Sequence, residues 1–214
     1  MTYSVKTIYY TLQGEGARTG RPAVFLRFAG CNLWTGREKD RARAVCNFCD
    51  TEFVGTDGPG GGKFRTAAGL AAAVASHWPD ADVPNDPYVV CTGGEPLLQL
   101  DDAAIDALHE VGFEVGIETN GTRVSPAGVD WICVSPKAGA EVVQTSGDEL
   151  KLVYPQAEQE AQPARFERLD FDHFYLQPLD DEHKDRNTDA TIQYCLTHPK
   201  WKLSLQTHKI IGMP

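Results

Sequence analysis

Short apolar runs recur along the chain, and polar or glycine-containing segments separate them. Each run is rich in β-branched and aromatic residues, which is typical of strands that are buried in a sheet. The pattern predicts strands at Val24–Phe28, Tyr88–Cys91, Phe113–Ile117, Trp131–Val134, Leu150–Tyr154, Phe174–Gln177 and Trp201–Leu205.

Helical patterns fill several of the intervals between these runs. The predicted helices are Thr66–His77, Asp101–Val111 and Thr188–Leu196. Thr66 and Asp101 are suited to cap a helix N-terminus, and Gly112 stands where a glycine commonly ends a helix. Strands that alternate with helices indicate βα units and a mainly parallel sheet.

Polar residues follow the predicted strands. Cys31 comes after the first strand, and later strands lead into Thr92–Pro96, Glu118–Gly121, Ser135–Lys137, Gln177–Pro178 and Gln206–Lys209. Barrels and open α/β sheets bind their ligands at the carboxyl ends of the strands. We therefore expect these segments to share one site.

The chain is short for a closed barrel. Its 214 residues fall below the roughly 250 that are typical of eight βα units, and residues 131–154 leave little room for a crossover helix. We expect an α/β fold, a partial and abbreviated TIM-type barrel, with mostly parallel strands and missing helices. The Gly-rich stretch 55–64 and the stretch 79–87 are expected to be loops.

Composition places the chain among ordinary globular proteins, with 42% hydrophobic and 23% charged residues. We expect a single domain over residues 1–214. The N-terminus does not resemble a signal peptide, and no apolar run approaches the ~20 residues that span a bilayer, so a soluble cytoplasmic protein is expected. The formal charge of −10 arises entirely beyond residue 100. The one basic cluster, residues 37–43, contains acidic residues and is interpreted as a solvated loop, so nucleic acid is not an expected partner.

The six cysteines divide into two groups by their surroundings. Cys91 and Cys133 lie in apolar strand-like runs and Cys195 lies in a helix-like run, so all three are interpreted as small buried hydrophobic residues. Cys31, Cys46 and Cys49 stand among Gly, Asn and Asp, and the last two form a C-x-x-C pair. These are the candidate metal ligands.

Two kinds of metal site suit three thiolates. A structural zinc site requires a fourth ligand, which His208 or His77 would supply. A cubane iron–sulfur cluster held by three cysteines leaves one iron free of protein ligands, so that a small molecule can chelate it. The second alternative favours catalysis over a structural role.

Several motifs make a more specific resemblance. Cys46–Asp50 and Gly93–Pro96 resemble the cluster-binding and GGEP segments of the radical S-adenosylmethionine superfamily. Further segments narrow the likeness to the 7-carboxy-7-deazaguanine synthase family, in queuosine and 7-deazapurine biosynthesis. They are Leu12–Gly16, Arg27–Leu33, Cys49–Thr51, Cys91–Pro96, Glu118–Gly121, Ser135–Lys137, Gln177–Pro178 and His208–Lys209.

One departure from the superfamily lies between the first two cysteines. Three residues usually separate them, whereas this chain has fourteen, residues 32–45. Lengthening a loop to this extent costs only about 1.4 kcal/mol of closure entropy. The ligand set is therefore expected to tolerate the insertion.

The resemblance implies a radical carbon–nitrogen lyase. A reduced [4Fe-4S] cluster cleaves S-adenosylmethionine, and the resulting 5′-deoxyadenosyl radical takes hydrogen from C6 of 6-carboxy-5,6,7,8-tetrahydropterin. Ring contraction with loss of ammonia gives 7-carboxy-7-deazaguanine. The cluster and S-adenosylmethionine carry this chemistry, so no side chain is expected to be catalytic.

The resemblance also implies which residues bind each group. Cys31, Cys46 and Cys49 would hold the cluster, and the Thr51 hydroxyl would bind Mg²⁺. Residues expected to bind the substrate are Leu12, Gln13, Gly14, Glu15, Arg27, Thr92 and the terminal Pro214. Residues expected to bind S-adenosylmethionine are Phe48, Asp50, Gly94, Ser135, Pro136, Lys137, Gln177, Pro178, Leu179 and Asp180.

Each of these assignments has a simpler alternative. Arg27 also suits a surface ion pair, Thr51 a turn or cap, and Gln13–Glu15 or Ser135–Pro136 an ordinary turn. For the whole chain, the alternatives are a glycyl-radical activating enzyme and a zinc-stabilised binding module. The resemblance further implies a flavodoxin-like external electron donor and a homodimer.

Overall fold

The computed structural model describes residues 2–79 and 86–214, so residues 80–85 of the predicted loop 79–87 lie outside the described part. Within that part, nine strands form one sheet. They are β1 (Tyr3–Leu12), β2 (Pro22–Phe28), β3 (Gly62–Phe64), β4 (Tyr88–Gly93), β5 (Glu114–Thr119), β6 (Trp131–Val134), β7 (Ser146–Tyr154), β8 (Asp170–Pro178) and β9 (Trp201–Leu203).

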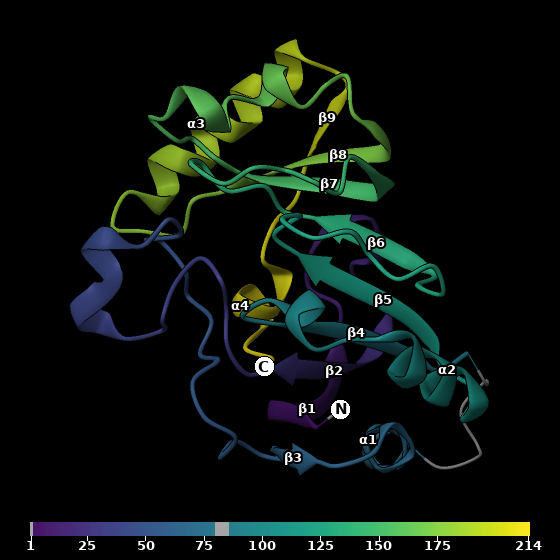
Figure 1. Ribbon diagram of the computed structural model, residues 1–214. Coiled ribbons are helices and arrows are strands. Elements are labelled where there is room, and N and C mark those ends of the chain that lie inside the picture. Colours follow the sequence, from purple (N-terminus) through teal and green to yellow (C-terminus); the bar gives the residue numbers. More distant parts are fainter. Residues whose placement is uncertain (1, 80–85) are drawn as a thin grey trace.

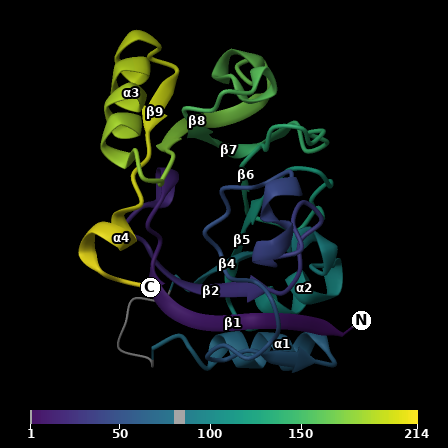
Figure 2. The same ribbon diagram turned by 90° about the vertical axis from the view of Figure 1, so that its left-hand side faces the viewer.

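The sheet is an open, mostly parallel partial barrel, which confirms the predicted fold class. Its strand order is β3-β1-β2-β4-β5-β6-β7-β8-β9, so β3 and β9 are the two edges. All pairs from β2 to β9 are parallel, whereas β1 pairs antiparallel with both β2 and β3. Figures 1 and 2 show the sheet curving from β1 and β2 to β8 and β9, with its ends apart.

The N-terminal strand β1 was not predicted. Tyr3, Val5 and Ile8 are buried on it, but Lys6 interrupts the apolar pattern and is buried as well. Lys6 pairs with Glu52 and Asp57, both at 2.8 Å. A register shift between residues 5 and 7 accommodates this side chain, and it breaks the alternation that identifies a strand.

The edge strand β3 corrects the prediction that residues 55–64 form only a loop. Gly62–Phe64 pairs with Tyr3–Val5 of β1. A three-residue edge strand that contains glycine gives almost no hydrophobic pattern, so its formation depends on the partner strand. The preceding residues remain irregular.

The helices are α1 (Ala67–Ala75), α2 (Asp102–Glu110), α3 (Lys184–Thr197) and α4 (Thr207–Ile211). Thr66 and Asp101 cap α1 and α2 as predicted, by accepting hydrogen bonds from backbone N–H groups three residues ahead, at 3.1 and 3.0 Å. Helix α3 begins at Lys184 rather than Thr188, and α4 was not predicted. No helix of the described residues has the length and apolar character needed to cross a bilayer.

Helices are missing from one half of the barrel, as expected. In the described chain no α-helix joins β5 to β6 or β6 to β7, and only the 3₁₀ turns Gln159–Ala161 and Pro163–Arg165 lie between β7 and β8. Without covering helices, that half exposes loops at the strand ends. Figure 1 shows α1 and α2 beside the lower half of the sheet and α3 beside the upper half.

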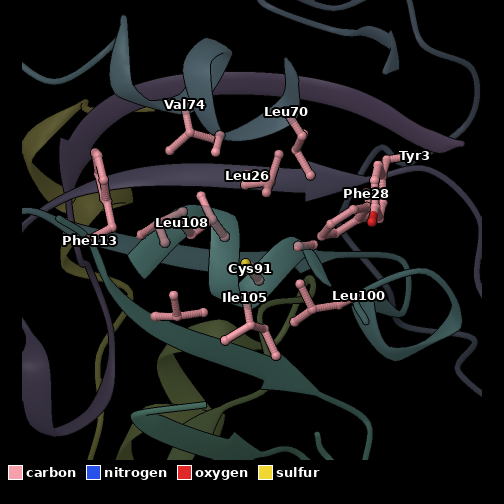
Figure 3. Packing of buried hydrophobic residues seen from close by; sticks show 14 of the residues in the cluster. Tyr3, Leu26, Phe28, Leu70, Val74, Cys91, Leu100, Ile105, Leu108 and Phe113 are labelled. Carbon is pink, nitrogen blue, oxygen red and sulfur yellow. The ribbon is translucent and has the colours of Figure 1, made fainter. Parts of the chain in front are cut away.

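The main core lies between the sheet and helices α1 and α2. Leu70 and Val74 of α1 face Leu26 of β2, while Ile105 and Leu108 of α2 lie beside the central strands (Figure 3). A second core packs α3 against the later strands. Burial of these faces fixes the strand ends that carry the polar motifs.

The three cysteines assigned to the core differ in burial. Cys91 and Cys133 are buried as predicted, whereas Cys195 is only half-buried. Cys195 packs at the margin of the core beneath α3, which covers only part of its side chain. The helical pattern around it did not distinguish the core-facing positions from this margin.

Candidate active site

One pocket of about 330 Å³ lies at the carboxyl ends of the strands. Its walls come from the turn after β1, the exits of β2, β4, β5, β6 and β8, the interior of β7, and the C-terminal segment. Every residue expected at the site lines this pocket, apart from Pro136, which is buried beside it. The structure thus brings together motifs that are almost 200 residues apart in the sequence.

Three free cysteines share one wall of the pocket. Cys31 follows β2, while Cys46 and Cys49 follow the insertion. The interaction of the two neighbouring thiols lowers the pKa of Cys49 to about 6 and raises the pKa of Cys46. Burial is the main cause of the raised pKa of Cys31. Cys49 is therefore the thiol that ionises first.

The Gly93–Gly94 backbone packs tightly against the loop that carries Cys31. Gly93 has a φ of 131°, which L side chains rarely adopt, and a Cβ at Gly94 would overlap the Gly30 carbonyl and the Cys31 Cβ. Only glycine permits this approach. Thus the strand exits of β2 and β4 form a cradle of bare backbone beside the first thiol.

Glu95 fixes the cradle to the next strand. Its fully buried carboxylate accepts hydrogen bonds from the Leu97 N–H (3.0 Å), the Thr119 hydroxyl (2.7 Å) and the Asn120 N–H (2.8 Å). Burial raises the pKa of Glu95, and these hydrogen bonds oppose the rise. The acidic residue of the GGEP motif therefore joins the exits of β4 and β5.

The cysteine wall fits a cubane cluster. In a cubane each cysteine binds a different iron, whereas a single ion needs ligands that converge on one point. Among the described residues, no three His, Cys, Asp or Glu side chains are arranged to hold a single metal ion. The three thiols do border one cavity, beside a glycine cradle and the Lys137 amine. Lys137 also favours the thiolate forms of Cys46 and Cys49.

Arg27 supplies a positive charge to the pocket that the thiols line. Its guanidinium donates to the Tyr9 hydroxyl at 3.0 Å, and no carboxylate of the described residues pairs with it. Thr92 stands beside Arg27 on the neighbouring strand. Thr51, half-buried in the cysteine loop, also lines the cavity. An arginine in such a place is suited to bind an anionic ligand.

A buried charge cluster forms the floor of the pocket, and the sequence analysis did not identify its centre. Lys151 of β7 lies 2.7 Å from Glu15 and 3.5 Å from Glu118. Glu118 also accepts hydrogen bonds from Gln13 (3.1 Å) and Thr92 (3.4 Å). The residues expected to bind substrate are therefore joined through Glu118, which belongs to the predicted Glu118–Gly121 motif, and through Lys151, which no motif had singled out.

The charges in this cluster depend on each other. Burial would raise the pKa of Glu15, but the charge and hydrogen bond of Lys151 lower it below its usual range. Burial opposes the charged form of Lys151, yet Glu118 and Glu15 raise its pKa well above normal. Glu149 lies two residues before Lys151 and has a pKa that burial raises. This spacing of charges within an apolar strand was the available signal for an inward-facing polar pair.

The C-terminal segment closes one side of the pocket. Lys209 of α4 pairs with Asp50 of the cysteine loop and with Asp180 after β8, both at 2.6 Å. The backbone oxygen of Pro214 accepts a hydrogen bond from Thr11 at 3.3 Å. In Figure 2 the C-terminus lies beside the end of β1. The strand exits and the chain terminus are thus tied to one another.

Comparison with known proteins adds to this picture. No family model matches the chain. A 7-carboxy-7-deazaguanine synthase of Caulobacter vibrioides is 65% identical over 214 residues, and one of Bordetella pertussis is 63% identical, both covering 100% of each chain. The chain belongs to the 7-carboxy-7-deazaguanine synthase family. The crystal structure of QueE from Escherichia coli matches with a TM-score of 0.73 at 29% identity, over 97% of this chain and 95% of that one.

Membership of the 7-carboxy-7-deazaguanine synthase family confirms the resemblance drawn from the motifs. The protein is an enzyme of the queuosine pathway, and the alternatives of a glycyl-radical activating enzyme or a zinc-stabilised module are set aside. The similarity to these relatives spans the whole chain, and so it includes every segment that lines the pocket.

Proposed function

We propose that this protein converts 6-carboxy-5,6,7,8-tetrahydropterin to 7-carboxy-7-deazaguanine with loss of ammonia. One observation carries the proposal: three free thiols, an arginine without a carboxylate partner and a cluster of hydrogen-bonding groups line the same 330 Å³ pocket. A concave pocket with a few converging polar groups is typical of a small-molecule site. The family of the close relatives supports the same reaction.

The cysteine wall is proposed to hold a [4Fe-4S] cluster through Cys31, Cys46 and Cys49. Together with S-adenosylmethionine, this group supplies a 5′-deoxyadenosyl radical when it is bound. The backbone of Gly94, which lines the pocket beside Cys31, is proposed to contact the methionine part of S-adenosylmethionine. Further contacts to this cofactor are proposed for Phe48, Asp50, Ser135, Pro136, Lys137, Gln177, Pro178, Leu179 and Asp180.

Arg27 is proposed to bind the carboxylate of the pterin. A guanidinium matches a carboxylate with two parallel hydrogen bonds, and Arg27 has no carboxylate partner among the described residues. The Thr51 hydroxyl is proposed to ligate Mg²⁺, which would also bind this carboxylate. Magnesium commonly combines one protein oxygen with oxygens of substrate and water.

The floor of the pocket is proposed to recognise the pyrimidine edge of the pterin. That edge carries N–H donors and a carbonyl acceptor, which Glu15, Glu118 and Gln13 complement. Lys151 lowers the pKa of the buried Glu15, which therefore remains an acceptor, and its ammonium also lies 3.5 Å from Glu118. Leu12, Gly14 and Thr92 complete this wall, and the terminal carboxylate of Pro214 is proposed to reach the same ligand.

Anaerobic reconstitution tests the proposal. Protein loaded with iron and sulfide, then given reductant, S-adenosylmethionine, Mg²⁺ and the tetrahydropterin, is expected to form 7-carboxy-7-deazaguanine. Cleavage of S-adenosylmethionine without this product would reject the substrate. Protein that takes up no cluster under these conditions would reject the cofactor. The flavodoxin-like electron donor and the homodimer stay predictions.

A further inference from the structure

The insertion between the first two cysteines folds back on itself. The Val45 N–H donates to the Leu33 carbonyl at 3.1 Å, so residues 33–45 form a closed loop. A 3₁₀ turn spans Glu38–Arg43 within it, and Thr35 donates to Asp40 at 2.9 Å. Figure 1 shows this turn on the left, away from helices α1 and α2. The segment is therefore an ordered unit rather than a slack linker.

Arg41 of this turn contacts the C-x-x-C segment directly. One terminal nitrogen of its guanidinium donates to the backbone carbonyls of Asn47 and Cys49, both at 2.9 Å. Its Nε donates to both carboxylate oxygens of Glu38, at 2.8 and 2.9 Å. This corrects the interpretation of residues 37–43 as a merely solvated basic loop.

An aromatic stack holds the guanidinium in place. It lies over the Trp34 ring, 4.2 Å from the ring centre. The Trp34 ring in turn packs edge-on against Phe53, with centroids 5.6 Å apart. Both aromatic side chains are buried and both line the pocket. Arg41 is thus fixed from one face by the core and from its edge by Glu38.

These contacts constrain the two peptide groups that follow Asn47 and Cys49. Because one Arg41 nitrogen donates to both carbonyls, the two carbonyl oxygens must stay close to each other and point toward that nitrogen. The planar guanidinium supplies several donors at once, whereas a lysine ammonium cannot stack and fork in the same way. The turn that carries Cys46 and Cys49 is therefore constrained by contacts from within the chain.

We infer that Arg41 is a positioning residue that preorganises the C-x-x-C turn for an iron–sulfur cluster, and that the insertion serves to deliver it. This inference rests on the proposed cluster, but Arg41 itself reaches only the backbone of the turn. A turn ordered in advance loses less conformational entropy when the cluster binds. The insertion thereby offsets the freedom that a longer loop adds between Cys31 and Cys46.

The test compares Arg41→Met and Arg41→Lys with Arg43→Met. Arg43 lies on the same turn, is 84% exposed and pairs with Asp40 at 3.7 Å and with no other carboxylate of the described residues, so it is a matched control. In metal-free protein, amide exchange at residues 46–51 is expected to speed up in Arg41→Met but not in Arg43→Met. Urea midpoints are expected to agree among the variants, which shows that the change is local.

In reconstituted protein, Arg41→Met is expected to release iron to a chelator roughly tenfold faster than wild type, because charge-assisted hydrogen bonds are lost. Arg41→Lys is expected to restore only a minor part of the iron retention, since lysine keeps the positive charge but lacks the several donors of the planar guanidinium. Exchange and release equal to the control, or full recovery by lysine, would overturn the inference. Wild-type protein without a cluster would instead reject the proposed function, and the exchange measurement would still decide on Arg41.

Discussion

Lys151 is the side chain whose removal should damage the pocket most specifically. Its ammonium lies 2.7 Å from Glu15, and the two side chains are 7% and 15% exposed. Removing one partner of a buried ion pair typically costs about 3–5 kcal/mol, because the remaining charge stays buried. We expect Lys151→Met to lower the free energy of unfolding by this amount at pH 8, with Gln206, 3.0 Å from Glu15, as a remaining donor.

The loss should depend on pH with a definite sign. In the wild type the folded-state pKa of Glu15 is depressed, so its stabilising effect is present above the unfolded pKa near 4.5 and disappears as the pH falls through the folded value. Without Lys151, burial raises the folded pKa above the unfolded one. In the Lys151→Met protein, the buried Glu15 then lowers the free energy of unfolding at any pH at which it must ionise. The difference between the two proteins should therefore shrink as the pH falls from 8 to 5.

Anaerobic urea unfolding of metal-free protein, followed by tryptophan fluorescence, measures both effects. Lys202→Met is the control, because Lys202 is exposed on β9 and forms no ion pair among the described residues. Its loss should stay within about 0.5 kcal/mol. The reasoning would be refuted if Lys151→Met matched the control at pH 8, or if its deficit were the same at pH 5.

Three further substitutions test other parts of the site. Arg27→Lys should lower kcat/KM for the pterin roughly tenfold to a hundredfold through loss of bidentate binding, while the free energy of unfolding stays unchanged. A kcat/KM equal to that of the wild type would show that Arg27 does not bind the substrate carboxylate. Glu95→Gln places an amide donor against buried donors, so thermal unfolding should report about 1–3 kcal/mol of lost stability, and an unchanged Tm would contradict this. Lys209→Met removes the two ion pairs that join α4 to Asp50 and Asp180, so proteolysis near the C-terminus should accelerate, whereas Lys63→Met should leave it unaltered.

The elements that the sequence predicts well are those with strong local signals. Helices α1 and α2 begin at Thr66 and Asp101 because those side chains satisfy free N–H groups of the first turn. Strand β6, which matches its prediction at both ends, is a continuous apolar run whose last two residues are buried. Strand β1 was not predicted because the partners that stabilise the buried Lys6, Glu52 and Asp57, lie 46 and 51 positions further along the chain.

The candidate site was predictable wherever a motif follows a strand, and less so inside a strand. Cys31 and Gly94 meet because neighbouring parallel strands end at the same edge. Lys151 faces inward within an apolar run, and only the register of β7 with its neighbours reveals that it reaches Glu15. Arg41 lies in a charged loop, and its contact with the cysteine turn depends on how residues 32–45 fold back. Such pairings are tertiary, so local patterns do not contain them.

The central claim is that the pocket brings C6 of the pterin to the radical generated from S-adenosylmethionine. The most direct measurement uses substrate deuterated at C6 with anaerobically reconstituted, reduced protein. Deuterium is predicted to appear in S-adenosylmethionine or 5′-deoxyadenosine recovered from the reaction, together with 7-carboxy-7-deazaguanine. Product formed without deuterium in either recovered nucleoside would contradict the account.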